Sequence, residues 1–241
     1  MSSSMRITAI SDIHGSLISI EPTDILIIAG DWSPLEIQQD LPKMKYWFEF
    51  NFIPWLATIE AERIFFIAGN HDFLCDSSYW KQCFNLNFDF KRKFFTDILK
   101  KYNLEEKICY LENSSVEYNG YIIYGCPYIE GCTGWAFCHA EYKKVYNQIP
   151  KCDILITHQP PDFYNVGAIV KYGIRYNFGS VRLLCTLTNI KPRYHFCGHI
   201  HEGDHIENIL EYRDKSITHI YNCAVKNEDY NLYFPNQIID I

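Results

Sequence analysis

Short apolar runs alternate along the chain with longer segments in which apolar residues recur every three or four positions. The runs are rich in Ile and aromatic residues and are bounded by Gly, Asp or Pro, a pattern typical of buried β-strands. We predict strands at residues 5–10, 24–30, 63–69, 121–126, 153–158, 193–198 and 216–222, with a last short strand at 237–241.

The segments with helical spacing lie between these strands. We predict helices at residues 35–60, 78–101, 139–148 and 180–189, with Pro54 bending or ending the first one. No linker, repeat or low-complexity segment separates the elements. Residues 1–241 are therefore predicted to form a single α/β domain, a size that one fold unit can reach.

Polar residues cluster where five of the predicted strands end. The clusters are Ser11-Asp12-Ile13-His14-Gly15, Gly30-Asp31, Gly69-Asn70-His71-Asp72, Thr157-His158-Gln159 and Gly198-His199-Ile200-His201. In open α/β sheets, ligands bind beyond the carboxyl ends of the strands. Five of the nine histidines lie in these clusters, so we predict that the clusters form one site rich in nitrogen and oxygen ligands.

The spacing within the clusters favours a divalent-metal site. Residues i and i+2 of an extended strand project to the same side. We therefore expect Asp12 with His14, and His199 with His201, each to direct two ligands toward one point. A single histidine at a strand end is usually structural, but five such clusters favour metal binding. Carboxylate, carboxamide and imidazole ligands without thiolate suit Mn, Fe, Zn or Co better than Ca or Mg.

The composition narrows the classes of protein to which this chain could belong. The net charge of −7, from 22 basic and 29 acidic residues, argues against broad binding to nucleic acid. The apolar stretches are too short for a membrane span, and the first residues carry no signal-peptide pattern. The ten cysteines include no C-x-x-C pair, which predicts buried, reduced thiols and a cytoplasmic protein. The aromatic fraction of 16% fits a homodimer surface and ordinary core packing equally well.

The order of the motifs points to a known family. D-x-H, G-D, G-N-H-D, a single H after a strand, and G-H-x-H span residues 12–201 and together resemble the calcineurin-like metallophosphoesterases. The stretches DILITHQPP (153–161), CGHIHEG (197–203) and YNCAV (221–225) are most similar to class III phosphodiesterases and the metallophosphoesterase-domain-containing subgroup. The resemblance implies a four-layer α/β/β/α sandwich, two mixed sheets flanked by helices, with a dinuclear metal centre at one edge.

The resemblance also implies a role for each residue of the motifs. Asp31 would bridge two divalent metal ions, and the other ligands would divide into two sets. These are Asp12, His14 and His201 for one ion, and Asn70, His158 and His199 for the other. His71 would act on the substrate phosphoryl group. Asp72 would either fix the imidazole tautomer of His71 or cap the following helix.

These features predict an enzyme that hydrolyses phosphodiesters by attack of a hydroxide that bridges two metal ions. The predicted substrate is a cyclic nucleotide or another small nucleotide, bound by Asn70, His71, Arg175 and His139. Aromatic residues of the surrounding loops would either stack on a base or pack the loops themselves. They are Tyr128, Trp135, Phe137, Phe163, Tyr164 and Tyr176.

Three other functions remain open. A phosphomonoesterase or phosphoprotein phosphatase of the same superfamily is one, although GDWSPL and GNHDFL depart from the G-D-x-x-D-R and G-N-H-E of that branch. A non-catalytic metal-binding scaffold is another, and it would be favoured by the loss of a ligand or of His71. A DNA-repair nuclease of the same fold is disfavoured by the acidic charge and the lack of an added DNA-binding segment.

Overall fold

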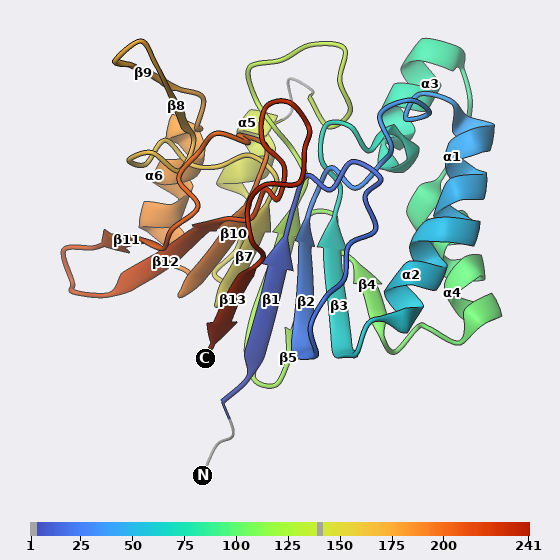
Figure 1. Cartoon of the computed structure of the whole chain (residues 1–241), viewed down its shortest axis with the longest axis horizontal. Helices are drawn as coiled ribbons and strands as arrows, with labels where there is room; N and C mark the ends of the chain where they lie inside the picture. Colours follow the sequence, from blue (N-terminus) through green and yellow to red (C-terminus); the bar gives the residue numbers. More distant parts are fainter. Residues whose placement is uncertain (1–3, 139–141) are drawn as a thin grey trace.

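The computed structural model describes residues 4–138 and 142–241. Two large β-sheets lie face to face, and helices cover the outer face of each sheet (Figure 1). The four-layer α/β/β/α arrangement predicted from the sequence is therefore confirmed. His139, one of the predicted substrate contacts, lies outside the described residues.

The first sheet has the strand order β13-β1-β2-β3-β4. Its strands are β1 (Arg6–Ile10), β2 (Thr23–Ala29), β3 (Ala61–Ile67), β4 (Ile108–Tyr110) and β13 (Gln237–Asp240). Strands β1 to β4 are parallel to one another, and β13 is antiparallel to β1. The carboxyl ends of β1, β2 and β3 therefore meet at one edge of this sheet.

The second sheet has the strand order β11-β12-β10-β7-β6-β5. Its strands are β5 (Ser114–Tyr118), β6 (Tyr121–Cys126), β7 (Ile154–Thr157), β10 (Tyr194–Cys197), β11 (Asn208–Glu211) and β12 (Ile217–Asn222). The four central strands are parallel, and the two edge strands are antiparallel to their neighbours. A separate hairpin consists of β8 (Ala168–Lys171) and β9 (Ile174–Asn177).

The side chains of β2 alternate between the two faces of the first sheet. Ile25 and Ile27 face the second sheet, where they pack in one cluster with Ile154 of β7. Leu26 and Ile28 face the opposite way and pack under the helices. Because both faces are buried, the strand has a continuous apolar sequence, which is why it could be predicted from the sequence.

The first helical segment over the first sheet begins later than the sequence predicts. The predicted helix at 35–60 consists of α1 (Leu41–Trp47), a π-helical turn (Phe48–Phe52) and α2 (Ile53–Thr58). Asp40 caps α1, since its carboxylate accepts a hydrogen bond from the Lys43 backbone N–H at 3.1 Å. Pro54 does not end the helical path. It follows the π-helical turn, where the hydrogen-bonding pattern already changes.

The single helix predicted at 78–101 is wrong. This stretch forms α3 (Ser77–Phe84), then a π-helical turn (Phe90–Phe95) that continues into α4 (Thr96–Tyr102). Asn85 ends α3 in the left-handed conformation, with a φ of 53°. Asp89 starts the next helical segment by accepting a hydrogen bond from the Arg92 N–H at 3.0 Å.

Two helices cover the second sheet, as the sequence predicts. They are α5 (Tyr142–Asn147) and α6 (Val181–Ile190), whose first turn is capped by Ser180. Residues 139–141 of the predicted helix at 139–148 are outside the described part. A short 3₁₀ turn (Phe73–Cys75) follows β3. Across the described ranges, no helix combines the length and the apolar character that crossing a bilayer requires.

The strands that the sequence did not predict are short or partly exposed. They are β4, β5, β8, β9 and β11. β5 lies at the edge of the second sheet and alternates between half-buried and exposed residues. β8 and β9 form a hairpin around Tyr172 and Gly173, both with positive φ. Such strands are stabilised by pairing, so their own sequence carries a weak signal.

A buried histidine in the second sheet makes the stability of the folded chain depend on pH. His195 of β10 is fully buried, and its Nε2 lies 2.8 Å from the Thr157 hydroxyl, which itself donates to the Gln159 carbonyl. Thr157 therefore accepts a hydrogen bond from the Nε2–H of a neutral imidazole. Nδ1 of His195 is buried without a partner in the described part of the chain. Burial lowers the pKa of His195 to about 3.

We predict that acid weakens the fold through His195. The unfolded chain binds a proton at this residue below about pH 6.5, whereas the folded chain does not until about pH 3, so stability falls with pH in this window. The expected loss is about 2 kcal/mol at pH 5 relative to neutral solution. Urea unfolding of wild type and His195→Leu at pH 7.5 and pH 5 measures it. Between pH 7.5 and pH 5, wild type should lose about 2 kcal/mol of stability relative to His195→Leu, and a constant difference would contradict the prediction.

Candidate metal centre

The predicted polar clusters converge at one edge of the stacked sheets. They follow β1, β2 and β3 of the first sheet, and β7 and β10 of the second. In Figure 1, β1, β2 and β3 all run toward the same edge. Backbone hydrogen bonds join the clusters, from the Asp12 N–H to the Gly30 carbonyl at 3.0 Å and from the Gly198 N–H to the His158 carbonyl at 2.9 Å.

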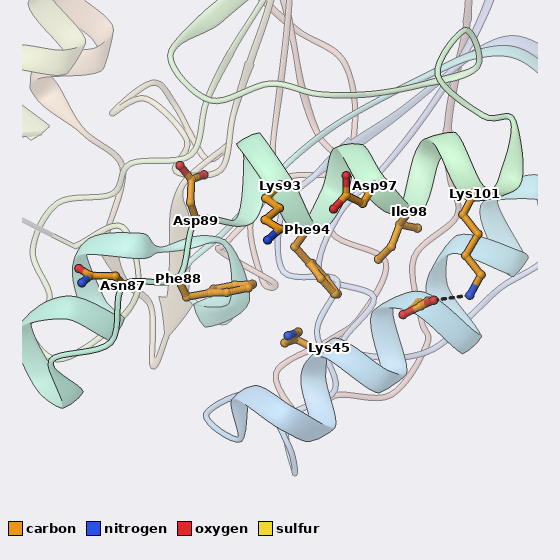
Figure 2. A pocket seen from close by; sticks show the side chains of 10 residues that line it. Lys45, Asn87, Phe88, Asp89, Lys93, Phe94, Asp97, Ile98 and Lys101 are labelled. Carbon is orange, nitrogen blue, oxygen red and sulfur yellow. Dashed lines mark hydrogen bonds and ion pairs between the residues drawn. The ribbon is translucent and has the colours of Figure 1, made fainter.

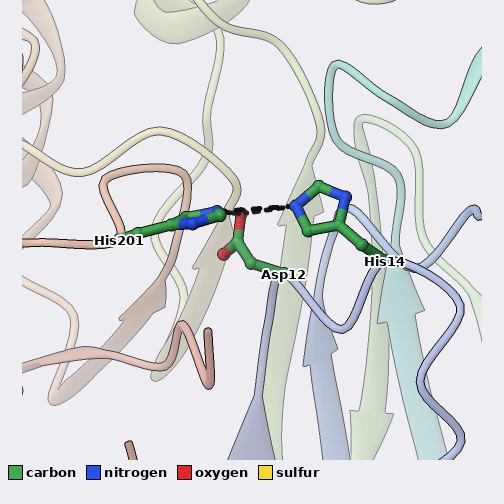
Figure 3. Close-up of side chains that lie close together, drawn as sticks. All are labelled: Asp12, His14 and His201. Atoms are coloured by element: carbon green, nitrogen blue, oxygen red, sulfur yellow. Dashed lines mark hydrogen bonds and ion pairs between the residues drawn. The ribbon is translucent and has the colours of Figure 1, made fainter. Parts of the chain in front are cut away.

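The first group of ligand atoms consists of Asp12, His14 and His201 (Figure 3). Oδ1 of Asp12 lies 3.3 Å from Nε2 of His201 and 4.0 Å from Nε2 of His14. The two imidazole nitrogens are 3.4 Å apart. All three side chains are mostly or fully buried, although they come from segments 187 residues apart.

The second group consists of Asp31, His158 and His199, with Asn70 beside them. Nε2 of His158 lies 3.2 Å from Oδ2 of Asp31 and 3.1 Å from Oδ1 of Asn70. Oδ2 of Asp31 is also 4.0 Å from Nε2 of His14 in the first group. The Asp31 carboxylate therefore stands between the two groups.

The separations fit ligands arranged around cations. Two atoms that each lie about 2.1 Å from one ion are roughly 3.0–4.2 Å apart, depending on the angle between them. The distances in both groups fall in this range. Oδ1 of Asp12 is buried and accepts no hydrogen bond from the residues that the structure describes. A buried anionic oxygen without a donor is the site that a cation would complete.

The tautomers of two histidines strengthen the fit. Nδ1 of His158 donates to the Ala29 carbonyl at 2.8 Å, and Nδ1 of His201 donates to the Asn227 carbonyl at 2.8 Å. Their Nε2 atoms then direct lone pairs at the oxygens of Asp31, Asn70 and Asp12. Lone pairs facing one another are stabilised only by a proton or a metal ion between them. These residues fit divalent cations.

The charges of the two groups depend on one another. Burial would raise the pKa of Asp12 and Asp31, but the facing histidines outweigh it and lower both values. Burial opposes protonation of His158 and His201, yet the facing carboxylates raise the pKa of each to about 9. His14 is dominated by its burial, which lowers its pKa to about 4.

The backbone at the site is not extended, so the predicted reason for the convergence is wrong. Asp12, His14, Asp31 and His199 all have left-handed conformations, with φ between 40° and 69°. His199 and His201 do not face one point, since His199 belongs to the second group and His201 to the first. Tight turns after the strands, not strand alternation, aim these side chains.

The predicted glycines allow this close packing. A Cβ on Gly198 would lie 2.0 Å from Oγ of Ser11 and 2.3 Å from Oδ2 of Asp12. A Cβ on Gly69 would lie 2.3 Å from Oδ1 of Asp31. Any other residue at these positions would displace a carboxylate of the site.

Asp72 has neither of its predicted roles. Its carboxylate accepts three backbone N–H groups, from Asp31 and Gly69 at 2.7 Å and from Ser33 at 2.9 Å. It forms no side-chain cap on the following turn, and within the described ranges no hydrogen bond joins it to His71. Burial, followed by the Asp31 charge, raises the pKa of Asp72 to about 7, although the N–H donors oppose this shift. Asp72 holds the loops after β2 and β3 together.

His71 lies at the mouth of the centre. Its backbone N–H donates to Oδ1 of Asp31 at 2.8 Å, and its Nε2 is 3.9 Å from Oδ2 of the same carboxylate. Its ring packs against Trp135, with centroids 4.5 Å apart, and against His14 at 4.9 Å. Nδ1 of His71 contacts Oε1 of Gln38 at 2.7 Å. The predicted position beside the metal ligands is therefore observed, but its partner is Gln38.

Of the four predicted substrate contacts, Asn70 and His71 lie beside the ligand groups, Arg175 lies away from them, and His139 is outside the described residues. Nε of Arg175 bonds Oδ1 of Asn165 at 3.1 Å on the exposed β8–β9 hairpin, and Arg175 lines neither pocket at the centre. Phe137 is buried in the core. Among the predicted aromatic residues, Trp135 is the one with a ring contact to a residue of the site in the described ranges.

One cysteine pair corrects the prediction of reduced, buried thiols. Cys132 and Cys138 form a disulfide, and it closes the loop that carries Trp135. Cys83 and Cys185 are exposed. The loop is also anchored by the Ala136 N–H, which donates to the Asn70 carbonyl at 3.2 Å.

Three residues around the centre were not indicated by any sequence pattern. Gln38 contacts His71, the Asn227 carbonyl orients His201, and the Tyr230 ring packs against His14 at 5.0 Å and His201 at 5.2 Å. Asn227 and Tyr230 belong to the stretch KNEDYN, whose polar composition predicts only a turn. Their contribution depends on where that turn lies in space.

Two pockets open beside the ligands. One of about 420 Å³ is lined by His199, Glu130 and Phe178 among others, and one of about 200 Å³ by His199, His201, Glu202, Glu228 and Tyr230. A further pocket, of about 460 Å³, lies among the helices over the first sheet and shares no residue with the centre (Figure 2). The two pockets at His199 are therefore the spaces where a bound phosphoester would extend.

Sequence comparisons identify the family of this chain. The sequence model of the calcineurin-like phosphoesterase family matches residues 5–203. The human metallophosphoesterase domain-containing protein 1 is 31% identical over 251 residues, which cover 98% of this chain and 71% of the human protein. The Caenorhabditis elegans UPF0046 protein T07D4.2 is 27% identical over 255 residues, which cover 98% of this chain and 60% of that protein.

A solved structure supports the fold. Phosphopantetheinyl hydrolase from Mycobacterium tuberculosis superposes with a TM-score of 0.52 at 14% identity, over 95% of this chain and 92% of that chain. The chain belongs to the calcineurin-like phosphoesterase family. This family hydrolyses phosphoesters at a dinuclear divalent metal centre, and the two ligand groups are candidates for that centre.

We predict that Asp31→Asn lowers metal binding at both groups, because a neutral carboxamide replaces the one anion that faces both. His199→Ala should instead lower binding at the second group alone. Zinc or manganese content after dialysis, measured by elemental analysis, distinguishes these outcomes, with the exposed Asp214→Asn as a control. Loss of only one equivalent in Asp31→Asn would contradict the shared position.

Proposed function

We propose that this protein is a dinuclear-metal phosphodiesterase that acts on a cyclic nucleotide or another small nucleotide. Asp12, His14 and His201 would hold one ion, Asn70, His158 and His199 the other, and Asp31 would bridge them. The ions would be Mn, Fe, Zn or Co, because the ligands are imidazole and oxygen without thiolate. The observation that supports this proposal most directly is the Asp31 carboxylate, which faces both ligand groups.

Divalent ions at these positions would supply the electrophilic chemistry, by acidifying water and neutralising phosphoryl oxygens. The protein would supply the orientation. Two ions add +4 and the carboxylates of Asp12 and Asp31 add −2, so the loaded centre is positive within a chain of net charge −7. The phosphoryl group is therefore drawn to the centre. His71, at the mouth, lies where it can exchange a proton with a substrate oxygen.

The charges around the centre favour a diester over a monoester. The described residues that line the two pockets at His199 include the carboxylates of Glu130, Glu202 and Glu228 and no Lys or Arg. Lys171 pairs with Glu228 at 2.9 Å, but it does not line either pocket. A monoester carries a second negative charge that a site usually balances with Arg or Lys. A diester has one negative charge and a second organic group, which the pockets can hold.

An aromatic wall supports a nucleotide as the organic group. The Trp135 ring packs beside His71 and is 36% exposed, so part of it is accessible to a ligand. Phe178, which is 50% exposed, lines the larger pocket. Flat bases stack on such rings, and each stacked base contributes about 1–3 kcal/mol.

Two alternative functions are consistent with some of these observations. A phosphomonoesterase or phosphoprotein phosphatase would use the same ligands, but it would need cations that the pocket linings lack. A metal-binding scaffold would need no His71 at the mouth, whereas His71 is held there by Asp31, Trp135 and Gln38. Both alternatives are therefore less well supported than diester hydrolysis.

We expect the manganese-loaded or zinc-loaded protein to hydrolyse bis(p-nitrophenyl) phosphate faster than p-nitrophenyl phosphate. Rates with each ester and with 3′,5′-cyclic and 2′,3′-cyclic nucleotides, with and without chelator, test this. Chelator should abolish all activity. A preference for the monoester would favour the phosphatase, and no hydrolysis of any ester by a metal-replete protein would favour the scaffold.

We also predict that Glu130→Lys raises the efficiency on the monoester relative to the diester. The change places a cation in the larger pocket, and we expect a gain of several-fold at low ionic strength that disappears at high salt. Glu117→Lys on the exposed edge strand β5 makes the same charge change far from the pockets. An equal gain in Glu117→Lys would show that overall charge, not the pocket, is responsible.

A further inference from the structure

Several contacts hold His71 beside the centre. Its backbone N–H donates to Oδ1 of Asp31, and its ring makes an edge contact with His14 and a tilted contact with Trp135. These ring contacts restrict the orientation of the imidazole, but they do not decide which nitrogen carries the proton. That choice depends on the hydrogen bond at Nδ1.

Gln38 supplies that hydrogen bond. Its Oε1 lies 2.7 Å from Nδ1 of His71, the one hydrogen-bond contact of this nitrogen among the described residues. An amide oxygen is an acceptor, so Nδ1 carries the proton and donates it. In a neutral imidazole, Nε2 then has a lone pair, and it faces the space beside Oδ2 of Asp31, 3.9 Å away.

The segment that carries Gln38 is the same one that carries Asp31. Residues 31–40 connect β2 to α1, and Asp72 fixes their start through the N–H groups of Asp31 and Ser33. The turn before α1 is closed by the Asp40 N–H, which donates to the Ile37 carbonyl at 2.8 Å. One anchored loop therefore places both the shared carboxylate and the partner of His71.

We propose that Gln38 is a positioning residue of this site, which holds His71 in the tautomer with a proton on Nδ1 and a lone pair on Nε2. The proposed hydrolysis rests on the metal centre, and this inference adds how the chain presents His71 to it. A resting His71 of this kind accepts a hydrogen bond from a donor in the site. The neutral amide orients the ring without adding a third negative charge beside Asp12 and Asp31.

The chain offers a matched set of variants. Gln38→Leu removes the acceptor and keeps most of the bulk, whereas Gln38→Glu keeps an acceptor oxygen at the same reach. Gln39→Leu makes the same change at the neighbouring, exposed position of the same turn. Metal content and circular dichroism establish that each variant is folded and loaded.

The deciding measurement is ¹⁵N NMR of the imidazoles in the zinc-loaded protein, with His71→Ala used to assign the His71 signals. Wild type should show the Nδ1–H tautomer of His71, as should Gln39→Leu. Gln38→Leu should shift His71 toward the other tautomer or average the two, while Gln38→Glu keeps the wild-type pattern. An Nε2–H tautomer in wild type, or an unchanged His71 in Gln38→Leu, would overturn the proposal.

Turnover of bis(p-nitrophenyl) phosphate gives a second readout. Gln38→Leu should lower kcat by about tenfold to a hundredfold, the usual effect of losing a residue that orients a functional group, with KM and metal content little changed. Gln38→Glu should recover most of the rate. Because the NMR result does not require hydrolysis, failure of the proposed activity and failure of the Gln38 contact are distinguished.

Discussion

The position of one buried carboxylate governs this structure. Asp31 faces His158 at 3.2 Å and His14 at 4.0 Å through the same oxygen, while its other oxygen accepts the His71 N–H. The two ligand groups can form one dinuclear centre only because this side chain stands between them. The residues around Asp31 leave room for it in this position. Only glycine fits at position 69, because a Cβ there would lie 2.3 Å from Oδ1 of Asp31.

Such a centre is costly to build without its ions. The carboxylates of Asp12 and Asp31 are buried away from water, and four ligand positions have left-handed backbone conformations that cost about 1–3 kcal/mol each. The surrounding layers offset these costs, since Ile27, Ile154 and their neighbours form a fully buried core directly beneath the strand ends. Cations that bind the folded chain relieve the electrostatic part, so metal binding and folding stability are linked.

Residues of the loops after the strands position the other side chains of the site. Asp72 uses its carboxylate to join the loops after β2 and β3, and this leaves His71 to be oriented by Gln38 and Trp135. The pockets at His199 are lined by carboxylates of the surrounding loops. The candidate ligands lie where strands end, and loops supply the other groups around them.

The sequence alone was enough to predict the buried strands and the polar clusters that follow five of them, and the resemblance of those clusters to a known family implied the four layers. The strands have continuous apolar sequences and the clusters contain residue types that bind metal ions, so neither feature depends on knowing the packing. The weak edge strands, the end of α3 at Asn85 and the roles of Asp72, Gln38 and Tyr230 became apparent only in the folded structure. Edge strands are stabilised by pairing, so their own sequences carry a weak signal. Asp72, Gln38 and Tyr230 contact residues far away in the chain, and such a contact leaves no local pattern because its partner lies elsewhere in the sequence.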